Sequence, residues 1–233
     1  YGEECVKKFE GMWAFAIYDR KKRVLFISRD RFAEKPLYYL EAPEGIYFGS
    51  EIKFIRSLSG LNLTVNMQHV LRYLVNGYKA LYKQRETFFN EIKEVPFASN
   101  LVVKRDLTNR ISRYWTPVCE VKKMSLDEAV EGFKYYLKES IKIRLRSDVP
   151  LAFSLSGGVD SGTLASFAKK ALNYDVATFS IIDSEERYNE CDNIYSTIKD
   201  LGCKHTVIDI PQDKIFERLR TLINYHDAPV YTI

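Results

Sequence analysis

A glycine-rich turn between an apolar run and a helical pattern constrains the fold of this chain most strongly. It reads Ser156-Gly157-Gly158-Val159-Asp160-Ser161. Residues 149–155 before it are apolar and short enough for a central strand, and residues 163–172 after it predict a helix. The first N–H groups of a helix lack partners inside the helix and carry partial positive charge. The sequence therefore predicts an anion site, such as a phosphate site, in a strand–turn–helix unit.

The residue types in this turn indicate which phosphate chemistry it serves. Two glycines let the backbone approach phosphate oxygens, and Ser156 and Ser161 add hydroxyl donors. No Lys follows where a Walker-type loop has one. Asp160 stands there instead and would repel phosphate unless a divalent cation such as Mg²⁺ lay between them. An ordinary strand-to-helix turn without a ligand is the alternative, because Gly-Gly turns are common.

Strands and helices alternate from residue 125 onward. Ser125 and Glu128 form a capping box at the start of a helix. One buried face is predicted for this helix from the spacing of Leu126, Val130, Phe133, Leu137, Ile141 and Leu145. Strands are then predicted at 151–155, 177–182 and 205–210, and helices from 161, at 191–201 and at 213–224. This alternation predicts parallel β-α-β units with right-handed crossovers, which bind ligands at the carboxyl ends of their strands.

The first half of the chain predicts a different class of domain, rich in antiparallel strands. Residues 9–57 have a strand-like pattern, with a hairpin at 13–18 and 23–28 and further strands at 36–40 and 46–49. A helix is predicted at 67–75, and a last, peripheral strand pair at 100–104 and 111–115. The fold class is therefore a β-rich α+β domain over residues 1–116, a linker over 117–124 and a parallel α/β domain over 125–233.

Composition narrows the classes of partner. Lys plus Arg is 35 and Asp plus Glu is 31, and the formal net charge of +4 suits a small polyanion and gives no indication of nucleic acid. No apolar run approaches membrane-spanning length and no signal segment opens the chain, so we expect a cytoplasmic protein with no membrane partner. The four cysteines and three histidines are scattered, which favours neither a disulfide framework nor a zinc site.

Two signatures, in this order, resemble the glutamine-hydrolysing asparagine synthetase family. GMWAFAIYD at 11–19 and RDRFAEKPLYY at 29–39 are similar to the later part of a glutamine amidotransferase type-2 domain of the N-terminal-nucleophile class. SDVP at 147–150, the SGGVDS turn and YNE at 188–190 resemble the synthetase domain, a Rossmann-like PP-loop fold of the adenine nucleotide alpha hydrolases. The resemblance implies the C-terminal portion of the first domain and the N-terminal portion of the second, from a longer protein.

This resemblance implies an ATP-dependent carbon–nitrogen ligase. Aspartate would be amidated to asparagine through an aspartyl adenylate, with glutamine as ammonia donor and release of AMP and pyrophosphate. The implied small-molecule partners are aspartate, glutamine and ATP with Mg²⁺, and a homodimer is left open. The nucleophilic cysteine and the glutamine-binding residues would lie upstream of Tyr1, and Cys5 does not match that nucleophile. The chain by itself is therefore expected to be inactive.

The resemblance also implies site residues. Those that match the ATP-binding positions are Leu155, Ser156, Gly157, Gly158, Asp160, Ser161 and Ile181. Asp160 would hold Mg²⁺, and Glu190 and Asp227 are placed near the mouth of the site, although Glu190 could instead be a solvated acid at a helix start. Three residues depart from the family pattern: Ala33 and Ala228 replace a glycine and an acid, and Gly162 replaces a serine. Ala33 would be strained by about 1 kcal/mol if its φ is positive.

Other functions stay open at this point. A related amidotransferase or cyclase could act on another carboxylate. A tRNA-modifying ATP pyrophosphatase shares the glycine loop but not the β-rich first half. A catalytically idle scaffold of the same fold is favoured by the three departures. Arg29, Asp30 and Arg31 could also be an exposed ion-pair cluster that contributes little to stability.

Overall fold

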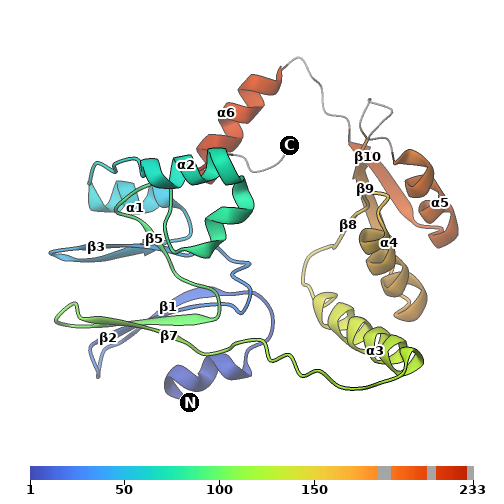
Figure 1. The fold of residues 1–233 in the computed structure, drawn as a ribbon, viewed down its shortest axis with the longest axis horizontal. Helices are drawn as coiled ribbons and strands as arrows, with labels where there is room; N and C mark the ends of the chain where they lie inside the picture. Colours follow the sequence, from blue (N-terminus) through green and yellow to red (C-terminus); the bar gives the residue numbers. More distant parts are fainter. Residues whose placement is uncertain (183–189, 209–213, 230–233) are drawn as a thin grey trace. The chain divides into compact units, whose positions relative to one another are not determined.

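The computed structural model describes residues 1–182, 190–208 and 214–229, and the chain divides into two compact units (Figure 1). The first unit comprises Tyr1–Cys119 with Ile215–Ile233, and the second comprises Glu120–Lys214. Antiparallel sheets form the first unit and a parallel sheet forms the second. The predicted fold class, an antiparallel β-rich domain followed by a parallel α/β domain, is confirmed.

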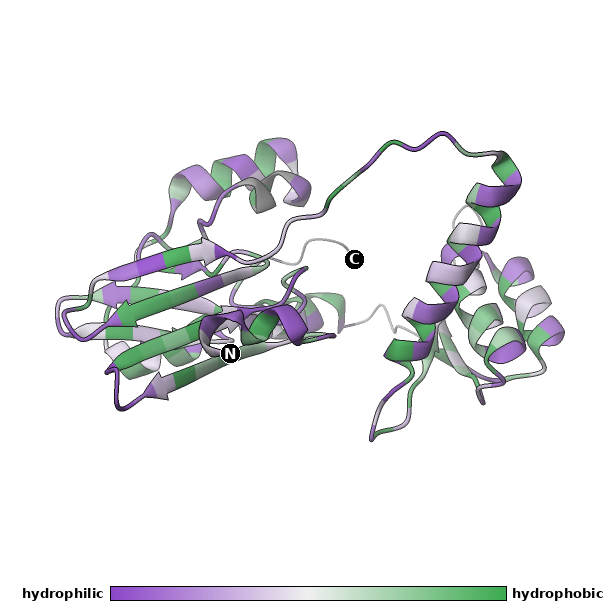
Figure 2. Ribbon diagram, turned by 90° about the horizontal axis from the view of Figure 1, so that it is seen from below, coloured by the Kyte–Doolittle hydropathy of each residue, from purple (hydrophilic) through white to green (hydrophobic). Residues whose placement is uncertain are grey.

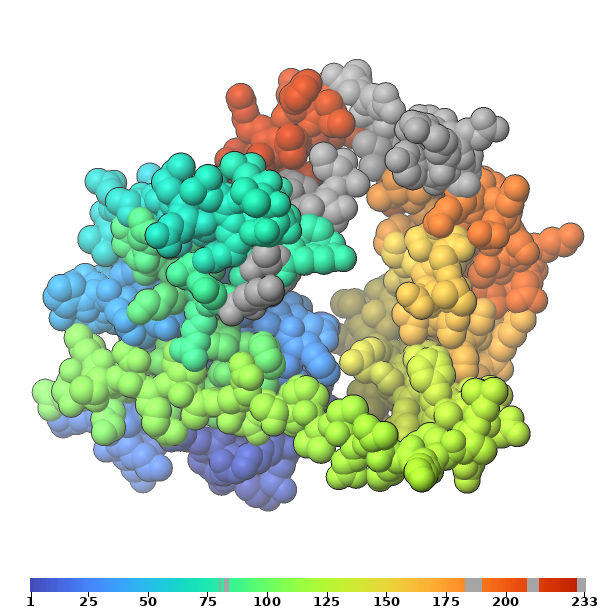
Figure 3. Space-filling model, viewed as in Figure 1, coloured from blue at the N-terminus to red at the C-terminus, as the bar shows by residue number. Residues whose placement is uncertain are grey.

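Two antiparallel sheets enclose the core of the first unit. One has the order β1 (Ala14–Asp19), β2 (Val24–Arg29), β6 (Ser99–Lys104), β7 (Asn109–Arg113), and the other the order β4 (Gly45–Gly49), β3 (Tyr38–Ala42), β5 (Lys93–Glu94). Ile27, Leu101 and Tyr39 are among the buried residues that join the sheets in one apolar cluster. Figure 3 shows the blue N-terminal strands and the green strands near residue 100 in contact.

The prediction of a peripheral strand pair is wrong for β6. This strand pairs with β2 on one side and β7 on the other, and its residues 99–103 are buried. Of the predicted pair, β7 alone is an edge strand of this sheet. The β2–β6 pairing joins residues more than seventy positions apart, so no local pattern could reveal it.

Helix α1 (Ile52–Ser59) packs on β3 and β4 of the second sheet, and the sequence pattern did not predict it. The other helical elements are η1 (Gly2–Lys8), α2 (Met67–Asn76), η2 (Tyr78–Lys83) and α6 (Ile215–His226). The strand-like pattern over 9–57 is wrong from residue 52, where Ile52 and Ile55 bury one helical face against Leu40 and Ile92. Gly60, in the left-handed conformation at φ 67°, ends α1.

Arg29 and Asp30 are buried rather than exposed, so the reading of an exposed ion-pair cluster is wrong for both. They are 4% and 1% exposed. The Asp30 carboxylate accepts the backbone N–H groups of Trp13, Phe32, Glu34 and Lys35 at 3.0–3.3 Å. The Arg29 guanidinium donates to the carbonyls of Ala33, Lys35 and Val95 and to the Glu94 carboxylate. Together they fix the loop between β2 and β3.

Ala33 lies in this loop at φ 55°, so the strain expected from the sequence is present. We expect Ala33→Gly to raise the free energy of unfolding by up to about 1 kcal/mol. The left-handed conformation strains alanine in the folded state, and this cost exceeds the loss in stability from the greater entropy of glycine in the unfolded chain. Urea unfolding measures the change. Ala42→Gly, in strand β3, is the matched control and should lower stability. Equal losses in both variants would contradict the strain at Ala33.

The second unit is built from β-α-β units, as predicted. Its parallel sheet has the order β10 (Lys204–Ile208), β9 (Ala177–Ile181), β8 (Phe153–Ser154). Its helices are α3 (Leu126–Arg144), α4 (Val159–Ser166), the π-helical turn η3 (Phe167–Ala171) and α5 (Cys191–Leu201). Ile141, Ala165 and Val176 belong to its core. Helix α4 begins at Val159, earlier than predicted, so the glycine turn leads directly into its first turn.

The predicted capping box of α3 is confirmed, but the predicted buried face is wrong for its first turns. The Ser125 hydroxyl accepts the Glu128 N–H at 3.2 Å, and the Glu128 carboxylate accepts the Ser125 N–H at 2.8 Å. Leu137, Ile141 and Leu145 reach the core. The earlier members of the stripe remain exposed: Leu126 by 79%, Val130 by 40% and Phe133 by 66%. Green (hydrophobic) and purple (hydrophilic) residues alternate along α3 in Figure 2. Such periodicity predicts an apolar face of the helix, but not whether other residues pack against it.

Across the described parts of the chain, no helix is both long enough and apolar enough to cross a membrane.

Candidate functional site

The glycine turn starts at the carboxyl end of β8 and is tied there to the neighbouring strand. The Leu155 N–H donates to the Phe179 carbonyl at 2.9 Å, and the Ser180 hydroxyl donates to the Leu155 carbonyl. Leu155 as a whole residue is 1% exposed and both of its backbone polar groups bond to β9, so the structure offers neither its side chain nor its backbone to a ligand. Ile181, at the end of β9, is 58% exposed and offers an apolar surface at the same sheet edge.

Hydrogen bonds from the two serines hold the turn in shape. The Ser161 hydroxyl, in the first turn of α4, accepts the Ser156 N–H at 3.2 Å and donates to the Gly158 carbonyl at 3.1 Å. The Ser156 hydroxyl accepts the Gly158 N–H at 3.4 Å and lies 3.2 Å from the Ser161 hydroxyl. The serines therefore organise the backbone that would face an anion.

Gly157 is the position at which the turn tolerates no side chain. Its φ is +81°, and a Cβ there would lie 2.6 Å from the Cβ of Glu190 and 3.0 Å from the Glu190 carbonyl oxygen. Glu190 is the N-cap residue of α5. The structure thus brings Glu190, which the sequence placed near the mouth of the site, into direct contact with the turn.

The start of α4 leaves its backbone donors without a side-chain cap. Gly158 is the N-cap residue and Asp160 is the acidic residue of the first turn, with its side chain exposed. No cluster of three His, Cys, Asp or Glu side chains occurs in the described ranges, so no all-protein metal cage is present there. Mg²⁺ commonly takes one or two carboxylates together with substrate phosphates, and a single exposed Asp160 beside a glycine cradle fits that donor set.

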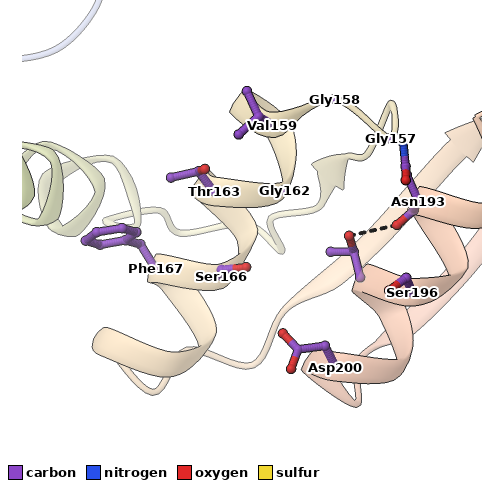
Figure 4. Close-up of a pocket in the computed structure, with 11 residues that line it drawn as sticks. Gly157, Gly158, Val159, Gly162, Thr163, Ser166, Phe167, Asn193, Ser196 and Asp200 are labelled. Carbon is purple, nitrogen blue, oxygen red and sulfur yellow. Dashed lines mark hydrogen bonds between the residues drawn. The ribbon is translucent and has the colours of Figure 1, made fainter.

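A groove of about 580 Å³ adjoins the turn between α4 and α5 (Figure 4). Its lining comprises Gly157, Gly158, Val159, Gly162, Thr163, Ser166, Phe167, Asn193, Ser196, Thr197 and Asp200. The Thr197 hydroxyl donates to the Asn193 carbonyl at 2.8 Å. A Cβ added at Gly162 would lie 3.9 Å from the Thr197 hydroxyl oxygen. The sequence pattern did not predict the hydroxyl and amide residues of this groove. The spacing of residues along one helix does not indicate which of its faces lies next to another helix.

Comparison with known proteins decides the family. Residues 1–115 match a glutamine amidotransferase domain, and residues 132–232 match asparagine synthase. The chain belongs to the glutamine-hydrolysing asparagine synthetase family.

Two curated relatives illustrate the extent of the match. Putative asparagine synthetase [glutamine-hydrolyzing] 2 of Methanocaldococcus jannaschii is 36% identical over 81% of this chain and 37% of that protein. Asparagine synthetase [glutamine-hydrolyzing] 1 of Bacillus subtilis is 26% identical over 99% of this chain and 36% of that protein. The chain thus spans just over a third of the length of these synthetases.

A solved structure, the NH3-dependent NAD synthetase from Campylobacter jejuni, matches at 21% identity and a TM-score of 0.30, covering 46% of this chain and 44% of that chain. This score is too low to support an argument.

Asp227, the other residue placed near the mouth, has its described contacts in the first unit. Its carboxylate accepts the N–H of Lys53, the second residue of α1, at 3.0 Å, and its own φ is 54°. The Lys53 ammonium donates to the carbonyls of Asn224 and Tyr225 at 3.2 and 2.8 Å. Asp227 therefore caps α1 and joins it to the end of α6.

We expect Asp227→Ala to lower the free energy of unfolding by about 1 kcal/mol, as loss of a helix cap does. Urea unfolding measures this, and Glu10→Ala, which removes an exposed acid, is the control. A loss no larger than that of the control would contradict the capping role. Titration with Mg-ATP separates this role from the predicted one at the mouth, because a cap alone leaves nucleotide affinity unchanged.

Proposed function

We propose that the protein containing this chain is an ATP-dependent, glutamine-hydrolysing asparagine synthetase, and that residues 156–161 hold the phosphates of ATP. One observation carries the proposal beyond family membership. The turn has a left-handed glycine with no room for a Cβ, directly before an uncapped helix N-terminus. Such backbone donors stabilise phosphate oxygens, and glycine lets them approach closely.

The proposed chemistry follows from the inertness of a carboxylate. Ammonia does not attack aspartate at useful rates, since an oxide is a poor leaving group. Attack of the carboxylate oxygen on the α-phosphorus of ATP breaks the α–β bond and releases pyrophosphate. Ammonia then attacks the acyl carbon, AMP leaves, and one proton is lost. Placement of the reacting groups by a fixed loop supplies much of the rate.

The residues of the turn have distinct parts in this proposal. The N–H groups at the start of α4 would stabilise charge on the phosphates, and the Ser156 and Ser161 hydroxyls keep that backbone in place. Asp160 would hold Mg²⁺, which when bound neutralises charge on the departing pyrophosphate. Ile181 would offer apolar surface for adenine, and Glu190 would limit the mouth. We assign no glutaminase nucleophile to this chain, and Cys5 lies half-buried in η1.

Asp160→Asn is expected to reduce aspartate-dependent pyrophosphate release by the full-length protein at least about 100-fold, because the cation would lose the carboxylate proposed to hold it. The measurement is pyrophosphate release from Mg-ATP, with unchanged thermal melting as the check on folding. Asp127→Asn is the matched control, since Asp127 is also an exposed acid in the first turn of a helix. Wild-type activity of Asp160→Asn would remove Asp160 from the site.

The same assay tests the substrate. We expect release to require aspartate and to yield asparagine. Release that depends on another carboxylate would place the protein among relatives with a different acceptor. No release with any carboxylate, from a protein that still binds Mg-ATP, would indicate a scaffold that has lost its chemistry.

A further inference from the structure

Two hairpin turns of the first unit form a basic cleft that the proposed reaction does not use. Residues 20–23 connect β1 to β2, and residues 105–108 connect β6 to β7. Val24 pairs with Lys104 across β2 and β6, so the turn between β1 and β2 and the turn between β6 and β7 lie at the same end of the sheet (Figure 1). A cavity of about 650 Å³ lies between the turns, lined by Lys22, Arg23, Val24, Lys104, Arg105 and Asp106. We call it the hairpin-tip cleft.

The chain leaves the positive charge of the hairpin-tip cleft largely unneutralised. Four of its six lining residues are cationic, and no described carboxylate lies within 4.0 Å of their nitrogens. Elsewhere in this unit Arg29, Lys93 and Arg110 each have such a partner. Like charges on facing strand ends repel one another.

Two nearby acids, Asp106 in the lining and Asp19 beside it, offset part of this charge while bonding within their own turns. One Asp106 oxygen accepts the N–H and the hydroxyl of Thr108 at 3.1 and 2.6 Å, and this bonding holds the pKa of Asp106 below its usual range. One Asp19 oxygen accepts the N–H groups of Lys21 and Lys22 at 2.9 and 3.0 Å. These bonds hold the turn backbones in place, so less ordering is required when a ligand binds.

We propose that the hairpin-tip cleft binds a polyphosphate group, separately from the nucleotide turn in the other unit. Two guanidinium groups can each donate two parallel hydrogen bonds to phosphate oxygens, and two lysines add point charges. The cleft is open to solvent, and its volume of about 650 Å³ matches a small anion rather than a folded partner. Inorganic triphosphate and the phosphate tail of a nucleotide share this chemistry, and the experiment distinguishes them.

The test is a titration of the isotope-labelled chain with inorganic triphosphate at low ionic strength without Mg²⁺, followed by backbone amide resonances. We expect saturable shifts in both turns, residues 20–24 and 104–108. Arg23→Gln with Arg105→Gln should weaken this binding at least about tenfold, because both bidentate donors are lost. The paired control, Lys134→Gln with Lys138→Gln on α3, removes the same charge elsewhere and should keep the affinity. If adenosine triphosphate binds with the same affinity as inorganic triphosphate, the cleft recognises the phosphates alone. If adenosine triphosphate binds more tightly, the cleft also contacts the nucleoside.

Three results would overturn the proposal. Shifts confined to residues 156–161 would leave only the nucleotide turn as an anion site. If the α3 control variant weakens triphosphate binding as much as the arginine variant does, the loss of affinity reflects only the net charge of the chain. Shifts that do not saturate would indicate diffuse screening. Folding of the double variant is checked without ligand, where loss of facing like charges should leave the melting temperature equal or higher.

Discussion

Replacing Gly157 with alanine is expected to abolish Mg-ATP binding by this chain. The new Cβ would lie 2.6 Å from the Cβ of Glu190, and the backbone at φ +81° is one that L residues rarely adopt. The turn would have to open, which moves the first N–H groups of α4 away from the phosphates. Calorimetric titration should show that the affinity for Mg-ATP falls at least about 100-fold, the size of effect expected when positioned groups are displaced by about 1 Å.

A matched glycine and a second-site change sharpen this prediction. Gly162→Ala lies in α4, the helix that follows the turn, where a Cβ meets nothing closer than 3.9 Å, and should retain binding. Glu190→Gly removes the clashing Cβ, so the double variant with Gly157→Ala should recover part of the lost affinity. Wild-type affinity in Gly157→Ala would show that the turn does not contact the nucleotide.

Asp30→Ala is expected to cause the largest loss of stability, about 3–5 kcal/mol, because it leaves four N–H groups of the enclosed loop without their acceptor. Urea unfolding at neutral pH measures the loss. Asp19→Ala, which frees two N–H groups in a partly exposed turn, is the control and should cost about 1 kcal/mol or less. Similar losses in the two variants would contradict a special role for the buried carboxylate.

The same carboxylate predicts how stability depends on pH. Burial alone would raise the pKa of Asp30, but the four backbone donors outweigh it and the pKa lies below its usual value. A depressed folded pKa means that the stabilisation is complete above the unfolded pKa, about 4, and is lost as pH falls through the folded value. The stability gap between wild type and Asp30→Ala should therefore narrow in acid. A gap that is constant with pH would contradict this ionisation.

Local patterns in the sequence were enough to predict the strand–turn–helix unit, the hairpin of β1 and β2 and the capping box of α3. Each depends on neighbours within a few residues, which share one local geometry. The strain at Ala33 was expected from the family resemblance, on the condition that its φ is positive, and the structure has φ 55° there. The contact of Glu190 with the turn was anticipated only through the family resemblance.

Contacts between distant segments account for what the sequence could not predict. The burial of Asp30 depends on N–H groups from Trp13 and from its own loop together. The three charged residues 29–31 have the same sequence pattern whether they are exposed or buried. The exposure of Leu126 depends on how far the second unit extends along α3. The hairpin-tip cleft likewise needs the register of β2 against β6, which brings together residues eighty positions apart.

Hydrogen–deuterium exchange of the chain, with and without Mg-ATP, tests most directly whether residues 156–161 hold the nucleotide. The account predicts slower exchange of the amides of the turn and of the first residues of α4 when Mg-ATP is present, and no such change in Gly157→Ala. Unchanged exchange throughout this segment, at Mg-ATP concentrations that raise the melting temperature, would place the nucleotide elsewhere and contradict the proposed site.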